Sequence, residues 1–194
     1  VEAGGVSNAT TGDATAGGTL HVTDVDASQS SFATSDTGTQ TGTYGSFTFD
    51  ATSGVWSYAL ENSDTQTQGL TAGETATETF TVHSVDGTAD TVVVTITGAN
   101  DVASFSDTSS DHAVTEDSTL DTTAGGTLSV TDVDVGQSSF TGYSGTSAYG
   151  SFSFNTGNGV WSYTINNSDP DFATLGSGQT ATETLTVTSA DGST

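Results

Sequence analysis

The sequence contains no lysine and no arginine, against 24 Asp and Glu residues, so its formal net charge is -24. A chain without cationic side chains cannot neutralise phosphate groups, which excludes the usual mode of nucleic-acid binding and attraction to an anionic membrane surface. Its carboxylates also lack lysine or arginine partners, and their mutual repulsion opposes the folded state. We therefore expect cations to offset this charge, either as bound metal ions or as high salt around a solvated acidic surface.

Cysteine is also absent, so no disulfide holds the fold. No apolar run is long enough for a transmembrane helix and no signal peptide is visible, so we expect any export signal to lie outside this sequence. Proline occurs once, whereas glycine occurs 24 times, mostly where turns are expected.

Three blocks of the first half of the chain recur in the second half. AGGTLHVTDVDASQSSF at 16–32 returns at 124–140 with three substitutions, YGSFTFDATSGVWSYALENSD at 44–64 returns at 149–169, and AGETATETFTVHSVDGT at 72–88 returns at 177–193. The spacing of a little over 100 residues is that of a whole domain and not of a solenoid turn.

This recurrence predicts two β-rich domains, at 1–99 and 113–194, joined by a linker at 100–112, and the family resemblance given below implies that this linker binds calcium. The segment DTVVVTITGAND at 90–101 has no counterpart after residue 193. We therefore expect the second domain to lack its final strand and to expose a sheet edge.

Short runs with apolar residues at every second position indicate half-buried strands, and Gly, Asp, Ser and Thr separate them as turn residues. Such runs occur at 19–23, 46–49, 55–60, 80–82 and 92–96. Domains of about 100 residues with this pattern predict an all-β fold of tandem immunoglobulin-like antiparallel β-sandwiches. Trp56 and Trp161 lie in such runs and are predicted core residues, the alternative being a sugar-binding platform.

Acidic residues recur at the end of one predicted strand. Asp24 and Asp26 follow the strand with Leu20, and Asp132 and Asp134 follow its copy. Ca²⁺ binds six to eight oxygens from carboxylates, amides and backbone carbonyls, so paired Asp residues at a strand end suit it. The alternative is that these residues only form turns.

A family resemblance rests on these motifs. An Asn100-Asp101 linker leading to Phe105, a Val-x-Glu opening at 114–116 and Asp-x-Asp after a strand resemble the layout of cadherins. The motifs TLxVTDVD, YGSFxF, GVWSY and TATETxTV are similar to VCBS repeats of giant bacterial RTX-type adhesins. The resemblance covers nearly the whole chain and implies cadherin-like sandwiches with Ca²⁺ between consecutive domains.

The resemblance also implies the ligands. Those implied for the ion at the junction are Asn100, Asp101, Glu116, Asp132 and Asp134, with Asp86 as a further candidate. Glu2, Asp24 and Asp26 would serve an ion shared with a preceding repeat. Val102 and Ala103 replace the Asn and Pro usual in cadherin linkers, and the cadherin Asp-Arg-Glu element is missing, which leaves the number of ions open. For the Asp86-Gly87 pair a simple hairpin turn is the alternative.

Catalysis has little support in the sequence. His21 and His83 become Ser129 and Thr188 in the second copy, and no nucleophile elbow, HExxH or phosphate-binding loop is present. Glu78 and Glu183 occupy equivalent positions on a Thr-rich strand, where we expect them to face solvent. We predict that the chain is not an enzyme.

The expected function is that of extender repeats in a giant bacterial surface adhesin, rigidified by Ca²⁺ at the inter-repeat junction and supporting cell adhesion and biofilm formation. We expect an extracellular monomer whose partners are neighbouring repeats of the same polypeptide, without contact to nucleic acid or membrane. The alternative is a β-sandwich module that binds a carbohydrate or protein ligand through exposed aromatics such as Tyr44, Tyr143 or Tyr149.

Overall fold

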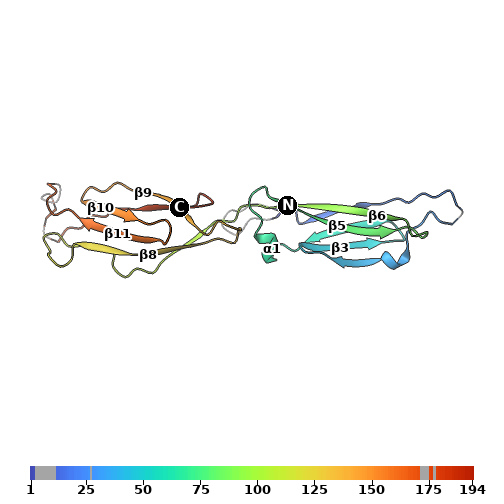
Figure 1. Ribbon diagram of the computed structural model, residues 1–194, viewed down its shortest axis with the longest axis horizontal. Coiled ribbons are helices and arrows are strands. Elements are labelled where there is room, and N and C mark those ends of the chain that lie inside the picture. The colour runs from blue at the N-terminus through green and yellow to red at the C-terminus, as the bar shows by residue number, and fades with distance from the viewer. Residues whose placement is uncertain (3–11, 27, 171–174, 177) are drawn as a thin grey trace. The chain divides into compact units, whose positions relative to one another are not determined.

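The computed structural model describes residues 1–2, 12–26, 28–170, 175–176 and 178–194, and its regular secondary structure consists almost entirely of antiparallel strands (Figure 1). The chain divides into two compact units. The first contains Val1–Val102 together with Val133–Val135, and the second contains Ala103–Asp132 and Gly136–Thr194. Within the described ranges, no helix has the length and hydrophobicity needed to span a bilayer.

The first unit has two layers of strands. Its elements are β1 (Thr15–Thr19), the 3-10 helix η1 (Thr34–Asp36), β2 (Gly38–Thr41), β3 (Gly45–Asp50), β4 (Val55–Leu60), α1 (Thr65–Gln68), β5 (Thr75–His83) and β6 (Ala89–Thr97). One sheet has the order β1-β4-β3-β2, and the hairpin of β5 and β6 forms the other. Figure 1 shows this hairpin lying over the sheet that contains β3.

Aromatic side chains fill the space between these two layers. Phe47 and Phe49 alternate along β3 and are 0% and 1% exposed. Phe47 stacks on Phe80 of β5 with ring centroids 4.8 Å apart, a spacing typical of favourable aromatic pairs. Val92, Val94 and Ile96 of β6 complete the core. The alternation predicted for 46–49, 55–60 and 92–96 is confirmed.

The first strand differs from the prediction. The alternation of Leu20 and Val22 predicted a strand at 19–23, but β1 covers the preceding residues Thr15–Thr19 and pairs with β4. Gly17 and Gly18 allow this pairing because they have no side chain. A Cβ atom would lie only 3.0 Å from the Trp56 carbonyl oxygen at Gly17 and only 3.1 Å from the Trp56 indole Nε1 at Gly18. Alternation reports which face a residue occupies, whereas a strand also requires a neighbour to pair with.

The second unit repeats part of this arrangement. Its strands are β7 (Ser104–Asp107), β8 (Thr123–Thr131), β9 (Phe140–Ser144), β10 (Gly150–Phe154), β11 (Val160–Ile165) and β12 (Thr186–Ser189). One sheet has the order β10-β11-β8-β7 and the other contains β12 and β9. Phe152 lies opposite Tyr163, the same register that Phe47 and Tyr58 have in the first unit.

Residues 100–112 are more than the predicted linker, because β7 lies within them. This strand pairs with Leu128–Thr131 and extends β8 to nine residues. The corresponding stretch of the first unit, 20–23, has no strand partner among the described residues, which explains why β1 is shorter than β8.

The core of the second unit is smaller. Among the residues that the structure describes, Ala124, Trp161 and Tyr163 form its buried cluster, and Phe152, Phe154 and Leu185 are half-buried around it. Trp161 is 9% exposed and donates from its indole Nε1 to Ser109 Oγ at 3.2 Å, so its predicted role in the core is confirmed. In the first unit, Trp56 is half-buried and stacks on Phe47.

The expectation that Glu78 faces solvent is wrong. Glu78 is 8% exposed, and its carboxylate accepts a hydrogen bond from the Tyr58 hydroxyl at 2.6 Å and bonds from the backbone amides of Thr43 and Tyr44. Side chains at every second position of a strand point to the same face, so Glu78 shares the inward face of β5 with Phe80 and Val82.

Glu183 has the same role in the second unit. Its carboxylate accepts from the Ser147 hydroxyl at 2.7 Å and from the backbone amides of Ala148 and Tyr149. Burial and the nearby Glu183 carboxylate raise the pKa of the Tyr163 hydroxyl to about 12. In each unit a glutamate therefore holds a loop through its carboxylate, and this glutamate is buried in the first unit and half-buried in the second.

We expect Glu78→Ala to destabilise the first unit by about 2–4 kcal/mol, because it leaves the Tyr58 hydroxyl and two backbone amides without an acceptor. Glu78→Gln keeps one acceptor oxygen and should cost less. Urea unfolding measures both, with Asp90→Ala on the exposed part of β6 as the control. Equal losses for Glu78→Ala and Asp90→Ala would contradict the assigned role.

Candidate metal centre

Three carboxylates that are distant in sequence are buried in the first unit. Glu2 is 0% exposed, Asp101 is 3% exposed and Asp134 is 2% exposed. Carboxylates are rarely buried this completely unless they are paired or bind a metal. The chain has no lysine or arginine to pair with them, although the charged N-terminus acts on Glu2.

Glu2 is held by the chain that follows β6 and by α1. Its backbone amide donates to the Thr97 carbonyl at 2.9 Å, and its carboxylate accepts from the Ala99 amide at 3.1 Å and from Gln68 Nε2 at 2.9 Å. Asp64 caps α1 by accepting from the Gln66 amide at 2.8 Å, which fixes the helical turn that carries Gln68.

Asp101 and Asp134 are joined directly. The backbone amide of Asp101 donates to Asp134 Oδ2 at 2.9 Å. Asn100 donates from its side-chain Nδ2 to the Asp101 carbonyl at 2.7 Å, which orients the turn after β6. The Val135 amide donates to the Gly69 carbonyl at 3.1 Å, so the segment 133–135 is fixed beside the end of α1.

The electrostatics of this group are unfavourable without a cation. Burial, together with the charges of Asp101 and Asp134, raises the pKa of the Glu2 carboxyl to about 7, although the hydrogen bond from the Ala99 amide and the charge of the N-terminus act to lower it. A carboxyl with a raised pKa loses free energy whenever it must be ionised. A bound cation would reverse this effect by favouring all three ionised carboxylates.

The donors of this group fit Ca²⁺ in their chemistry. Carboxylate, amide and backbone carbonyl oxygens are what Ca²⁺ takes, and the group offers no imidazole or thiolate that would favour zinc. In the described part of the chain, no three His, Cys, Asp or Glu side chains are arranged as a ready metal cage. Backbone or amide oxygens would therefore have to complete the coordination shell.

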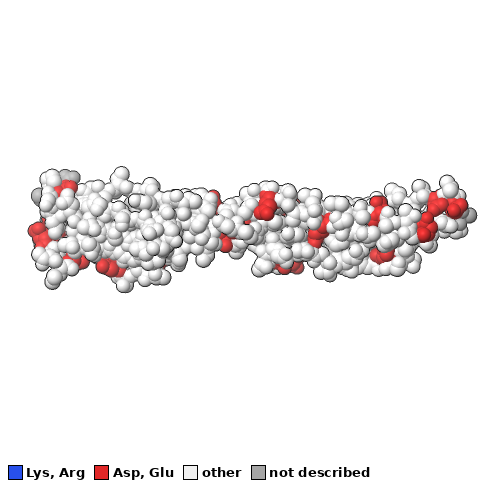
Figure 2. All heavy atoms as spheres, viewed as in Figure 1, with Lys and Arg blue, Asp and Glu red and all other residues white. Residues whose placement is uncertain are grey.

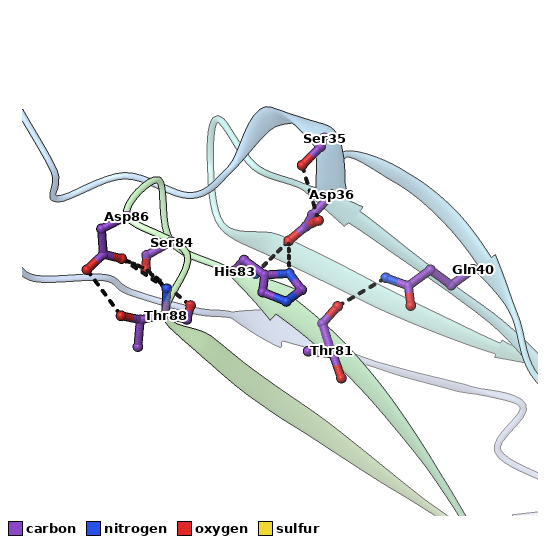
Figure 3. A network of polar contacts seen from close by, with 8 residues as sticks. All are labelled: Ser35, Asp36, Gln40, Thr81, His83, Ser84, Asp86 and Thr88. Carbon is purple, nitrogen blue, oxygen red and sulfur yellow. Dashed lines mark hydrogen bonds and ion pairs between the residues drawn. The ribbon is translucent and has the colours of Figure 1, made fainter.

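Asp86 is not brought to this group. It lies in the turn between β5 and β6, where its carboxylate accepts from the Thr88 amide and the Thr88 hydroxyl, both at 3.1 Å, and from the Ser84 hydroxyl (Figure 3). Gly87 has φ +90°, as the hairpin alternative requires. The nine residues of β6 separate this turn from Asp101, a span of roughly 30 Å at about 3.3 Å per residue.

A second polar contact beside this turn is structural. Asp36 of η1 accepts from the backbone amide of His83 and contacts its ring Nδ1 at 3.0 Å (Figure 3). This contact attaches η1 to the end of β5. Thr188 occupies the corresponding position of the second copy, so the contact with the imidazole is particular to the first unit.

Asp24 and Asp26 also lie away from Glu2. The Asp26 amide donates to Asp24 Oδ1 at 2.7 Å, and the Asp24 amide donates to Ser30 Oγ at 2.8 Å, which is turn geometry. The same loop reaches the β5–β6 turn, where the Val85 amide donates to the Ser31 carbonyl. The structure therefore does not group Glu2 with Asp24 and Asp26 as expected.

The structure does not bring Glu116 together with Asp132. Glu116 is exposed and precedes β8, whereas Asp132 and Asp134 follow that strand, so nine residues in extended conformation separate them. Asp132 is half-buried, and its backbone amide donates to Ser138 Oγ at 2.8 Å. Within the first unit, Glu2 is the glutamate whose carboxyl is influenced by Asp101 and Asp134.

The chain matches no known protein family and no characterised protein at a significant level of sequence similarity.

The raised pKa of Glu2 gives a pH dependence for the metal-free protein. Folded Glu2 keeps its proton up to about pH 7, whereas in the unfolded chain it loses the proton near its ordinary pKa of 4.5. The folded state therefore binds more protons between these values, and its stability falls as the pH rises through this window. We expect a loss of about 1–3 kcal/mol, since one pKa unit corresponds to about 1.4 kcal/mol.

Urea unfolding in EGTA from pH 5 to pH 8 measures this loss. Glu2→Gln stays neutral, so the free energy of unfolding of this variant should fall less as the pH rises. Glu74→Gln, on the exposed loop before β5, should show the same fall as the parent protein. If the free energy of unfolding of Glu2→Gln fell as steeply with pH as that of the parent protein, groups other than Glu2 would be responsible for the pH dependence.

Proposed function

We propose that the chain is a pair of calcium-stabilised, cadherin-like β-sandwich repeats that serve as a non-enzymatic extender in a giant bacterial surface adhesin. The observation that carries this proposal is the burial of Glu2, Asp101 and Asp134 in one unit of a chain without lysine or arginine. The similarity of its sequence motifs to VCBS repeats supports the adhesin context.

Calcium would act by joining segments that are remote in sequence. Glu2 lies at the start of the described chain, Asp101 follows β6, and Asp134 belongs to the short stretch 133–135 that falls within the first unit. An ion shared by these carboxylates would hold that stretch, which lies 30 residues beyond the rest of the first unit, in place. In our proposal, this limits the freedom between consecutive repeats.

The expected affinity suits an extracellular setting. Calcium sites of extracellular modules have Kd values of about 10⁻⁴–10⁻³ M, so they fill only outside the cell. A repeat that stiffens on export would project a distal adhesive domain from the cell surface. The absence of lysine and arginine also removes every cleavage site for trypsin-like proteases.

The ligand-binding alternative has weaker support. Tyr44 packs against the core of the first unit, and Tyr149 is half-buried. Tyr143 is 47% exposed, but its ring packs edge-on against Phe154 with centroids 5.7 Å apart. One half-exposed tyrosine on the core is a poor platform for a sugar ring.

We expect about 10 mM Ca²⁺ to stabilise the first unit by about 1.4–2.7 kcal/mol, which is the mass-action gain at about 10 to 100 times Kd. This corresponds to a rise in the thermal midpoint on the order of 10 °C for a domain of this size. Thermal unfolding in EGTA and in Ca²⁺ at constant ionic strength measures the effect. Glu2→Gln and Asp134→Asn should remove most of it.

Asp24→Asn and Asp86→Asn are the matched controls, because each also removes one carboxylate charge but lies in a turn away from Glu2. Both should keep the full response to calcium. If NaCl stabilised the protein as much as Ca²⁺ does, the result would instead support a halophilic acidic surface that binds no specific ion. Loss of the response in the control variants would show that general charge, and not this group, governs stability.

A further inference from the structure

The short helix α1 connects two parts of the candidate metal centre. The Gln68 side chain donates from Nε2 to Glu2 Oε1 at 2.9 Å. The next residue, Gly69, accepts from the Val135 amide through its carbonyl at 3.1 Å. Two consecutive residues at the end of one helical turn therefore hold both Glu2 and the segment 133–135, which carries the Asp134 carboxylate.

The turn that carries Gln68 is fixed by hydrogen bonds and by burial. The Gln68 amide donates to the Asp64 carbonyl at 2.9 Å, and the Leu70 amide donates to the Thr67 carbonyl at 3.1 Å. A helix of four residues is not stable by itself, so it depends on tertiary packing. The buried side chains of Thr67 and Leu70 supply that packing. Gln68 therefore reaches Glu2 from a restrained backbone.

The Glu2 carboxylate has a donor on each of its oxygens. Oε1 accepts from Gln68, and Oε2 accepts from the Ala99 amide at 3.1 Å. An ionised carboxylate offers about four lone pairs, so each oxygen keeps one for a cation. The two donors belong to separate segments, α1 and the chain after β6, and together they restrain the rotation of the carboxylate.

Gln68 is also a neutral group among carboxylates. Asp101 and Asp134 are buried in the same unit, and their charges act on Glu2. A glutamate at position 68 would add a further negative charge directly beside Glu2. The affinity of calcium sites depends on the number of charged ligands and on the rigidity of the site, and Gln68 affects both properties.

The repeated sequence does not require a glutamine at this position. The two sequence blocks that flank α1 recur at one constant spacing, so Ala173 corresponds to Gln68 in the second copy. The glutamine is thus particular to the first unit, in which its side chain meets a buried glutamate.

We propose that Gln68 is a positioning residue of the calcium site, whose amide orients the Glu2 carboxylate towards the ion and whose neutrality limits the negative charge of the group. This inference rests on the proposed function, because it assumes that calcium binds at Glu2, Asp101 and Asp134. A hydrogen bond that only stabilises the fold would affect the metal-free protein and leave the affinity for calcium unchanged.

Calorimetric titration of the full 194-residue chain with CaCl₂ tests the orienting role. Gln68→Met keeps a side chain of similar length but removes the amide. It should weaken calcium binding by about 10–100-fold, the usual effect of removing a group that hydrogen-bonds a metal ligand. Gln66→Met is the matched control, because Gln66 is exposed on the same turn, and it should bind calcium as the parent protein does.

Gln68→Glu tests the role of charge. Without calcium its carboxylate would face that of Glu2, so the thermal midpoint in EGTA should fall below that of the parent protein. Bound Ca²⁺ would offset the added charge, so CaCl₂ should raise the midpoint by more degrees than it does in the parent. Gln66→Glu makes the same change of charge on the exposed side of the turn and should leave this rise unchanged.

The outcomes separate the role of Gln68 from the calcium site itself. If the parent bound calcium, Glu2→Gln did not, and Gln68→Met bound it with the affinity of the parent, the site would stand and the orienting role would be wrong. An equal calcium-induced rise in Gln68→Glu and Gln66→Glu would contradict the role of charge. A parent protein that bound no calcium would overturn the proposed function together with this inference.

Discussion

The structure depends on how 24 carboxylates are accommodated by a chain that has no lysine or arginine. Hydroxyl groups and backbone amides take the place of cationic partners. Asp107 accepts from the Ser109 hydroxyl and contacts His112, which lower its pKa to about 2, and Asp86 accepts from the Ser84 and Thr88 hydroxyls. Figure 2 shows the resulting surface, with carboxylates in small separate groups and no cationic residue among them. Ser and Thr hydroxyls thus stabilise carboxylates that have no lysine or arginine partner.

Two buried arrangements depart from this pattern in opposite ways. Glu78 is buried with enough donors around it, since the Tyr58 hydroxyl and two backbone amides point at its carboxylate. Glu2 is also buried and hydrogen-bonded, but its burial and, to a smaller extent, the charges of Asp101 and Asp134 raise its pKa. The first arrangement is stable by itself, whereas the second favours an added cation. That contrast distinguishes a structural carboxylate from a candidate metal ligand in this protein.

The strands could be predicted wherever one face is apolar, because alternation fixes which side of a strand enters the core. β3, β4 and β6 follow this rule. β1 does not, since it is formed by TAGGT, whose glycines fit against Trp56 and carry no apolar pattern. The metal candidates show a similar limit. Asp101 and Asp134 could be found from local motifs, but choosing Glu2 over Glu116 requires knowing that a nine-residue strand separates Glu116 from Asp134.

The uniformly negative charge also affects how chain segments of similar sequence encounter one another during folding. Two halves that share so many residues can exchange equivalent strands while they fold, and tandem proteins commonly misassemble in this way. Attractive ion pairs between lysine and carboxylate would make such wrong encounters longer-lived, and this chain cannot form them. The net charge of -24 makes two copies of the chain repel each other. The charge composition therefore protects the chain against entanglement with its own copies, a form of specificity obtained by repulsion.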